Sequence, residues 1–126
     1  MGDQFNMSGD FRGAILNIRS TLTNAQQSVN EIRTDNLDAR QELAKLIAQL
    51  SDVLRDVPDP RQEQAEAVAQ TAKALIDTAK SEKPNQPLLQ ITGEGLKQAA
   101  QNLADVLPTV VTIAAQIVTT VMKLGG

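Results

Sequence analysis

Residues 22–57, LTNAQQSVNEIRTDNLDARQELAKLIAQLSDVLRDV, decide the fold of this chain. Apolar residues recur there at alternating intervals of three and four, the spacing that places side chains on one face of an α-helix. The members of this seam are Leu22, Ala25, Val29, Ile32, Asn36, Ala39, Leu43, Leu46, Leu50, Val53 and Val57. Leu37, Ile47 and Leu54 widen the stripe, which favours a helical bundle over a two-stranded coiled coil.

One polar residue, Asn36, lies on the seam. A buried Asn can set the register of a coiled coil. Thr34, Asp35 and Asn36 are also residues that cap helices, and we favour this second interpretation, a break or kink. Residues 57–60, VPDP, then end one helix and begin the next, because proline suits a helix start and Asp59 can cap it.

The later part of the chain also has helical periodicity. Residues 83–87, KPNQP, read as a linker, and Thr92 reads as the N-cap of a last helix. Gly93-Glu94-Gly95 lacks the spacing of phosphate-binding loops, so it indicates helix entry rather than a nucleotide site. Together the patterns predict helices at about 20–33, 36–57, 60–83 and 92–124.

The last predicted helix carries no charge over residues 106–122, VLPTVVTIAAQIVTTVM. Seventeen helical residues span about 25 Å, less than the roughly 30 Å of a hydrocarbon core, so the run is a poor membrane span. Pro108 should kink this helix. The apolar surface is broader than a small bundle needs, and we therefore expect it to contribute to an oligomer interface.

The opening segment, residues 5–18 (FNMSGDFRGAILNI), follows a different pattern. Apolar residues and glycines alternate there with polar residues, which is typical of a half-buried β-strand. Ser8-Gly9 is a turn signal, so the sequence predicts a β-hairpin that pairs residues 4–7 with residues 11–14.

An isolated hairpin is marginal in water and leaves two open edges that can pair with other chains. Three interpretations of the opening segment stay open: a mobile tail, a flap packed on its own bundle, and intermolecular β pairing in a ring or filament. We favour the third. The only two aromatic side chains of the chain, Phe5 and Phe11, also lie in this segment.

Composition argues against most enzymes. The 126 residues contain no Cys and no His, so a thiol nucleophile, a thiolate metal site and the commonest general base are all missing. Carboxylates and lysines remain, but no spacing suggests a catalytic pair. The net charge is −3 and no basic stripe is visible, which argues against nucleic acid as a partner.

Two stretches, GDQFNMSGDFRGAILNIRSTLTN (2–24) and ITGEGLKQAAQNLADVLPTVVTIAAQIV (91–118), resemble a set of small uncharacterised helical proteins and appended modules of cyanobacteria and related bacteria. This resemblance covers most of the chain and implies no activity. The layout, a Gly/Asn-punctuated β motif joined to helices, is also similar to that of bacterial amyloid-signalling effectors. That second similarity implies homotypic assembly and a membrane-perturbing helical domain in a conflict system.

The sequence therefore predicts a mainly α fold, an antiparallel three- to four-helix bundle with a short N-terminal β-hairpin-like segment. Residues 1–19 would form the oligomerisation segment and residues 20–126 the helical domain. We expect a non-enzymatic, self-assembling protein that forms homo-oligomers through the β segment and its apolar helices. The expected interface residues are Phe5, Met7, Phe11, Ile15, Leu16, Ile18, Leu22, Val29, Ile32, Val111, Val118 and Val121.

The alternative function is a membrane-active effector or signalling adaptor of a bacterial conflict system, in which the uncharged C-terminal helix inserts into a membrane. We expect no catalytic residue, no metal and no cofactor. The expected partner is a second copy of the chain, and a protein of the same operon is a further candidate. The first twenty residues lack the pattern of a secretory signal, which predicts a cytoplasmic protein.

Overall fold

A computed structural model describes residues 3–80 and 86–125, with side chains described for 16–80 and 86–124. Within these ranges the structure is helical and contains no strand. The elements are α1 (Asp3–Asn30), α2 (Leu37–Leu54), the short 3₁₀ helix η1 (Asp59–Arg61), α3 (Gln62–Ala79), α4 (Gln86–Gln101) and α5 (Pro108–Gly125). The predicted mainly α class is confirmed.

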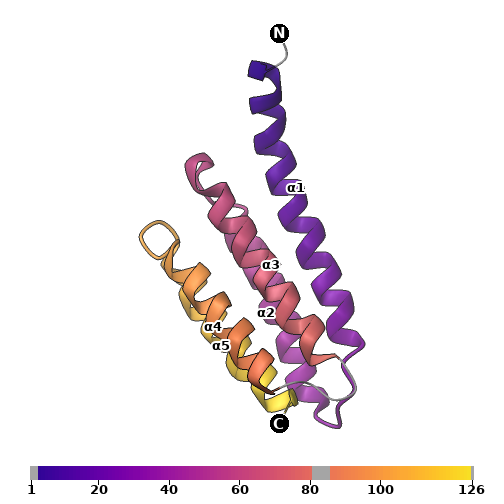
Figure 1. The fold of residues 1–126 in the computed structure, drawn as a ribbon. Coiled ribbons are helices and arrows are strands. Elements are labelled where there is room, and N and C mark those ends of the chain that lie inside the picture. The colour runs from indigo at the N-terminus through magenta and orange to yellow at the C-terminus, as the bar shows by residue number, and fades with distance from the viewer. Residues whose placement is uncertain (1–2, 81–85, 126) are drawn as a thin grey trace.

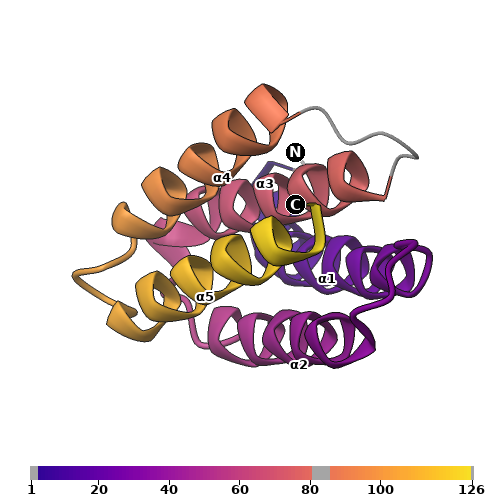
Figure 2. The same cartoon turned by 90° about the horizontal axis from the view of Figure 1, so that it is seen from below.

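The five α-helices run up and down in one bundle (Figures 1 and 2). Helix α1 packs against α2 and α3, and α4 packs against α3 and α5. Helix α5 also packs against α2, which closes the ring of contacts around a shared core. The core is aliphatic: its fully buried large side chains are those of Leu22, Ile32, Leu43, Ile47, Leu50, Leu54, Leu75, Ile76, Leu89, Leu96, Leu103 and Ile117.

The expected β-hairpin in residues 1–19 is not supported, because the backbone is helical from Asp3 onward. A helix satisfies its backbone hydrogen bonds within one segment, whereas an isolated hairpin leaves two open edges. The sequence contains the competing signal: the spacing of three and four that begins at Leu22 also continues backward through Ile18, Ile15 and Phe11. The helical period therefore outweighs the alternation of period two.

The predicted break at Asn36 is confirmed. Asn36 is the N-cap of α2, and its side-chain oxygen accepts a hydrogen bond from the Ala39 backbone N–H at 3.1 Å. The Asn36 N–H in turn donates to Thr34 Oγ1 at 3.0 Å. Asn36 is exposed, so it does not set the register of a buried seam. Leu37, which was expected to widen the stripe, is 52% exposed.

The predicted single helix at 92–124 is instead an antiparallel pair, α4 and α5. Helix α4 begins at Gln86, and Thr92 lies inside it, where its hydroxyl donates to the Leu88 carbonyl at 2.8 Å. Thr92 is therefore not an N-cap. Pro108 is the first residue of α5 rather than a kink, since a proline at this position loses no helical hydrogen bond. Residues 81–85, which overlap the predicted linker, lie outside the described ranges.

Helix α5 buries its apolar residues within the chain. Val110, Ala114, Ile117 and Val121 are fully buried between α5 and its neighbours. The broad apolar surface that predicted an oligomer interface is therefore covered by the protein's own α2, α3 and α4. The apolar surface of α5 is broad because this helix packs against α2 on one side and against α4 on another.

Candidate functional site

The side chains of eight of the twelve expected interface residues are described by the structure. Six of them are at most 6% exposed and belong to the chain's own core: Ile18, Leu22, Val29, Ile32, Val118 and Val121. Val111 is partly buried against that core, and Leu16 is 60% exposed on α1. Phe5, Met7, Phe11 and Ile15 lie on the helical backbone of α1, and their side chains lie outside the described set. In this conformation the first group holds the bundle together and does not face a partner.

Helix α1 is much longer than its neighbours. It has 28 residues, whereas α2, α3 and α5 have 18 each. Figure 1 shows the N-terminal part of α1, in indigo, extending past the ends of the other helices. We call residues 3–17 the projecting half of α1, because Ile18 is the first residue with a described side chain that is buried in the core. This half measures about 22 Å at 1.5 Å per residue.

The other half of α1 is tied to the bundle by polar contacts as well as by its apolar stripe. Gln26 Nε2 donates to the Ala44 carbonyl oxygen of α2 at 3.1 Å. On the α3 side, Lys80 Nζ donates to Ser28 Oγ at 3.4 Å and lies 3.7 Å from Glu31 Oε1. These contacts join the C-terminal end of α1 to α2 and α3.

The most buried acidic group of this region is Asp77, which forms an ion pair with Lys73 at 2.8 Å. Burial raises the pKa of the Asp77 carboxyl. The hydrogen bond from Lys73, the nearby Ser28 hydroxyl and the charges of Lys73 and Lys80 outweigh this effect and hold the pKa below its ordinary value of 3.8. Asp77 therefore stays ionised at neutral pH and serves as the counter-ion of Lys73 and Lys80.

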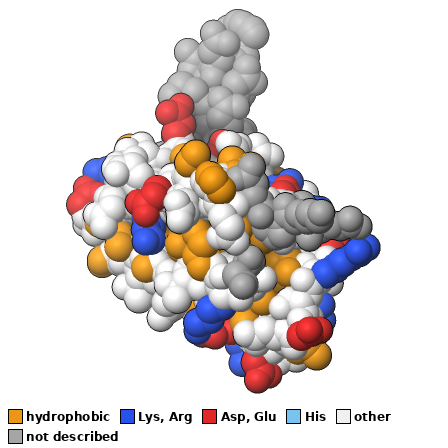
Figure 3. All heavy atoms as spheres, turned by 60° about the horizontal axis from the view of Figure 1, so that its bottom comes forward, with side chains coloured by type: hydrophobic (Ala, Val, Ile, Leu, Met, Phe, Trp, Pro, Cys, Tyr) orange, Lys and Arg blue, Asp and Glu red, His pale blue; other side chains and the backbone are white. Residues whose placement is uncertain are grey.

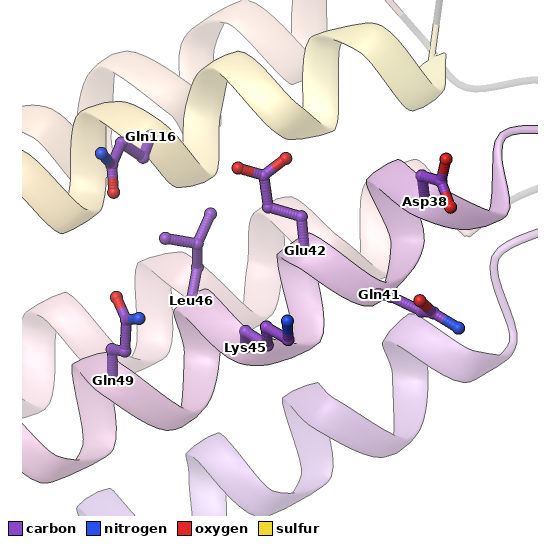
Figure 4. A pocket seen from close by; sticks show the side chains of 7 residues that line it. All are labelled: Asp38, Gln41, Glu42, Lys45, Leu46, Gln49 and Gln116. Carbon is purple, nitrogen blue, oxygen red and sulfur yellow. The ribbon is translucent and has the colours of Figure 1, made fainter.

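An open groove of about 360 Å³ lies between α2 and α5 (Figure 4). It is lined by Asp38, Gln41, Glu42, Lys45, Leu46, Gln49 and Gln116. Figure 4 shows six of these side chains spread along α2 and Gln116 on α5, without convergence on one point. Within the described part of the chain, no cluster of three or more acidic side chains could hold a metal ion. The groove presents dispersed polar groups to solvent.

A second open groove, about 680 Å³, lies between α4 and α5. Its floor contains Val118 and Met122, and its rim carries Lys97, Lys123 and Glu94. Lys97 Nζ lies 3.9 Å from Glu94 Oε1, so two of the three rim charges pair with one another. This groove is open to solvent and is lined by both apolar and polar side chains.

The described bundle surface is mixed in character. Figure 3 shows separate hydrophobic patches on one face, with side chains of both charge signs around them. The large hydrophobic side chains that are exposed in the described ranges are Leu16, Leu37, Leu88, Ile91 and Val106. Scattered apolar side chains of this kind are normal on soluble domains. The projecting half of α1 is therefore the feature that distinguishes this fold from an ordinary closed bundle.

Comparisons with protein-family models, with curated protein sequences and with solved structures found no match in any of the three. A separate test of the described helices found none that is both long and apolar enough to cross a membrane.

Proposed function

We propose that this chain is a non-enzymatic helical protein that assembles with copies of itself through the projecting half of α1. The interface differs from the expected one in its secondary structure, since the segment that was predicted to pair as β-strands is helical. The segment itself is unchanged: it is the same Gly-punctuated N-terminus that carries both phenylalanines.

The observation that carries this proposal is the continuation of the α1 stripe beyond the bundle. Ile18, Leu22 and Ala25 are buried at 2%, 1% and 0% exposure, so this face of α1 is the one that meets apolar neighbours. At about 100° per residue, Met7, Phe11, Ala14 and Ile15 fall on the same face of the helix. The sequence pattern of the stripe thus continues into the part of α1 whose backbone extends past the ends of the other helices (Figure 1).

The charges of the projecting half also fit an interface on this face. Asp3, Asp10 and Arg12 are the charged residues of positions 3–17. They fall roughly 60–120° away from Ile18 around the helix, so they flank the apolar stripe and none lies at its centre. The apolar face of an amphipathic helix is normally stabilised by packing against a partner rather than by intrinsic helix propensity.

The test is the mass of the full chain in solution, measured by light scattering over a range of protein concentrations. A mass above 13.5 kDa that rises with concentration is expected. Phe11→Asp should return the mass to that of the monomer, because it places a charge in the interface. Leu16→Asp is the matched control: it adds the same charge to the same projecting helix, but on the exposed opposite face, and should leave the assembly intact.

Leu16→Asp should keep the far-UV circular dichroism and the melting temperature of the bundle, because Leu16 is 60% exposed. The same two measurements on Phe11→Asp separate loss of assembly from loss of folding. A wild-type protein that stays at 13.5 kDa at all concentrations would refute the proposal. Equal loss of assembly in both variants would also contradict it, because the apolar stripe would then not be the surface involved.

The uncharged run of residues 106–122 favours a second candidate, a membrane-active effector. For this function α5 would have to leave the bundle, and its buried residues would then lose their contacts with α2 and α4. Arg61 restrains that step by binding the α4–α5 turn, where Arg61 Nη1 donates to the Asn102 carbonyl at 2.9 Å and to Asp105 Oδ1 at 3.2 Å. If the chain perturbs membranes, Arg61→Ala should release more dye from anionic vesicles than the wild-type protein does. If neither the wild-type protein nor the Arg61→Ala variant releases dye, this candidate function is excluded.

A further inference from the structure

We propose that the turn between α1 and α2 of one copy docks into the α4–α5 groove of a second copy. This contact uses surfaces other than the projecting half of α1. The residues that form it are Asp35, Leu37 and Asp38 of one copy and Lys97, Met122 and Lys123 of the other. The structure describes all six side chains: Met122 is partly exposed and the other five are exposed.

The turn presents an apolar side chain between two carboxylates. Leu37 is 52% exposed, and the hydrogen bonds of the Asn36 cap hold the backbone beside it. Among the large hydrophobic side chains that are exposed in the described ranges, Leu37 alone has two acidic residues, Asp35 and Asp38, within two positions. Figure 1 shows this turn at the end of the bundle opposite to the projecting half of α1. Assembly through α1 therefore leaves the turn accessible.

The α4–α5 groove has the complementary character. Met122 gives its floor an apolar side chain, and each wall carries a lysine, Lys97 on α4 and Lys123 on α5. Glu94 is the acidic residue of this lining, so two lysines against one glutamate leave the groove net positive. Leu37 would contact Met122 while the two aspartates beside it meet the lysines.

Charge distinguishes this groove from the one between α2 and α5. The charged residues that line the α2–α5 groove are Asp38, Glu42 and Lys45, so its net charge is negative and would repel an acidic turn. Opposite charges across a contact favour the correct partner surface, and like charges suppress the wrong one. The acidic turn therefore selects the α4–α5 groove.

The contact is weak. One leucine and exposed ion pairs correspond to a dissociation constant on the order of 1 mM, which is not populated in dilute solution. The masses expected above for dilute wild type and Phe11→Asp are therefore unchanged. Copies that are already joined through α1 reach effective concentrations in this range, where the contact would link them further. That role rests on the proposed assembly, whereas the contact itself does not.

Disulfide trapping tests the contact in the full chain, because the chain has no cysteine of its own. A chain with Asp35→Cys is mixed with a chain of different mass that carries Thr119→Cys, an exposed position of the α4–α5 groove. Gln49→Cys, an exposed position of the α2–α5 groove, is the matched control. The disulfide that joins positions 35 and 119 should form several times faster than the one that joins positions 35 and 49.

Charge reversal tests the pairing of the two surfaces. Asp38→Lys in the first chain should slow trapping at position 119 by roughly two- to tenfold, since it replaces an exposed attraction by a repulsion. Lys123→Glu in the second chain should restore the rate. Equal trapping at positions 119 and 49, or no recovery with Lys123→Glu, would overturn the inference. Failure of the proposed assembly is a separate result, a wild-type mass of 13.5 kDa at all concentrations.

Discussion

Gly93 is buried in α4 where this helix packs against α5. A Cβ atom added at Gly93 would lie 3.1 Å from Val118 Cγ1, closer than nine in ten observed contacts of this kind. Two residues later, a Cβ added at Gly95 would lie 3.8 Å from Thr71 Cγ2, which is an ordinary contact. The same substitution by alanine should therefore have different effects at these two positions of one helix.

The two effects can be estimated separately. Replacing glycine by alanine in a helix interior stabilises by about 0.8–1.0 kcal/mol. Gly95→Ala should realise most of this gain and raise the melting temperature by roughly 2–6 °C for a domain of this size. Gly93→Ala has the same propensity gain, but overpacking a core costs about 1–3 kcal/mol, so its net effect should lie between roughly zero and 2 kcal/mol of destabilisation.

Urea unfolding followed by circular dichroism measures both changes in the free energy of unfolding. A double-mutant cycle with Val118→Ala locates the cause, because removing Cγ1 and Cγ2 of Val118 should let Gly93→Ala become stabilising in that background. Gly95→Ala should have the same effect with or without Val118→Ala. If Gly93→Ala stabilised the wild-type protein as much as Gly95→Ala does, α4 and α5 would not approach each other as described.

Three further predictions concern polar contacts of the bundle. Asn36→Ala should lower the free energy of unfolding by about 1 kcal/mol through loss of the α2 N-cap, and Asn36→Asp should retain most of the stability; equal losses in urea unfolding would argue against the cap. Arg61→Ala should lower the free energy of unfolding by only roughly 0.5–1 kcal/mol, because its ion-pair partner Asp105 is largely exposed. Part of this loss should disappear at high salt, and a loss that does not depend on salt would show that the ion pair is not its source. Asp77→Asn should lower the free energy of unfolding at pH 7, because the pKa of Asp77 in the folded state lies below 3.8. The stability difference from wild type should shrink as the pH falls from 3.8 through that lower pKa. A stability difference that grows in acid would contradict a lowered pKa of Asp77.

The seam of residues 22–57 was sufficient to predict the C-terminal part of α1, helix α2 and the break between them. Its apolar members become core residues because their spacing matches the helical period, and Asn36 interrupts the seam with a cap that is visible in the sequence. The N-terminal part of α1 was mistaken for a strand, since residues 5–18 satisfy both periods at once. Only the continuation of the seam from Leu22 back to Phe11 distinguishes the two.

The turn between α4 and α5 was harder to predict. Residues 102–107 contain no glycine, so the local sequence permits a continuous helix with a kink at Pro108. In the structure the turn is closed by the Leu103 carbonyl, which accepts a hydrogen bond from the Leu107 N–H at 2.7 Å. Arg61, more than forty positions away, binds the same turn, and the linear sequence does not display such a contact.

The candidate interface could be predicted only in part. An apolar stripe has the same sequence pattern whether its own chain or another chain covers it. The burial of Ile18 and Val118 shows that the chain itself covers those positions. The structure adds that α1 is longer than the other helices, and this extra length lies at positions 3–17. The sequence did not predict it, because residues 1–19 were interpreted as a β segment.

The proposal that this protein assembles through the apolar stripe of the projecting half of α1 is tested most directly by the concentration dependence of its mass. Sedimentation or light scattering should show wild type and Leu16→Asp in equilibrium between 13.5 kDa and a larger species, with Phe11→Asp monomeric throughout. A wild-type protein that remains at 13.5 kDa up to the highest concentration, or a Phe11→Asp variant that assembles like wild type, would contradict it.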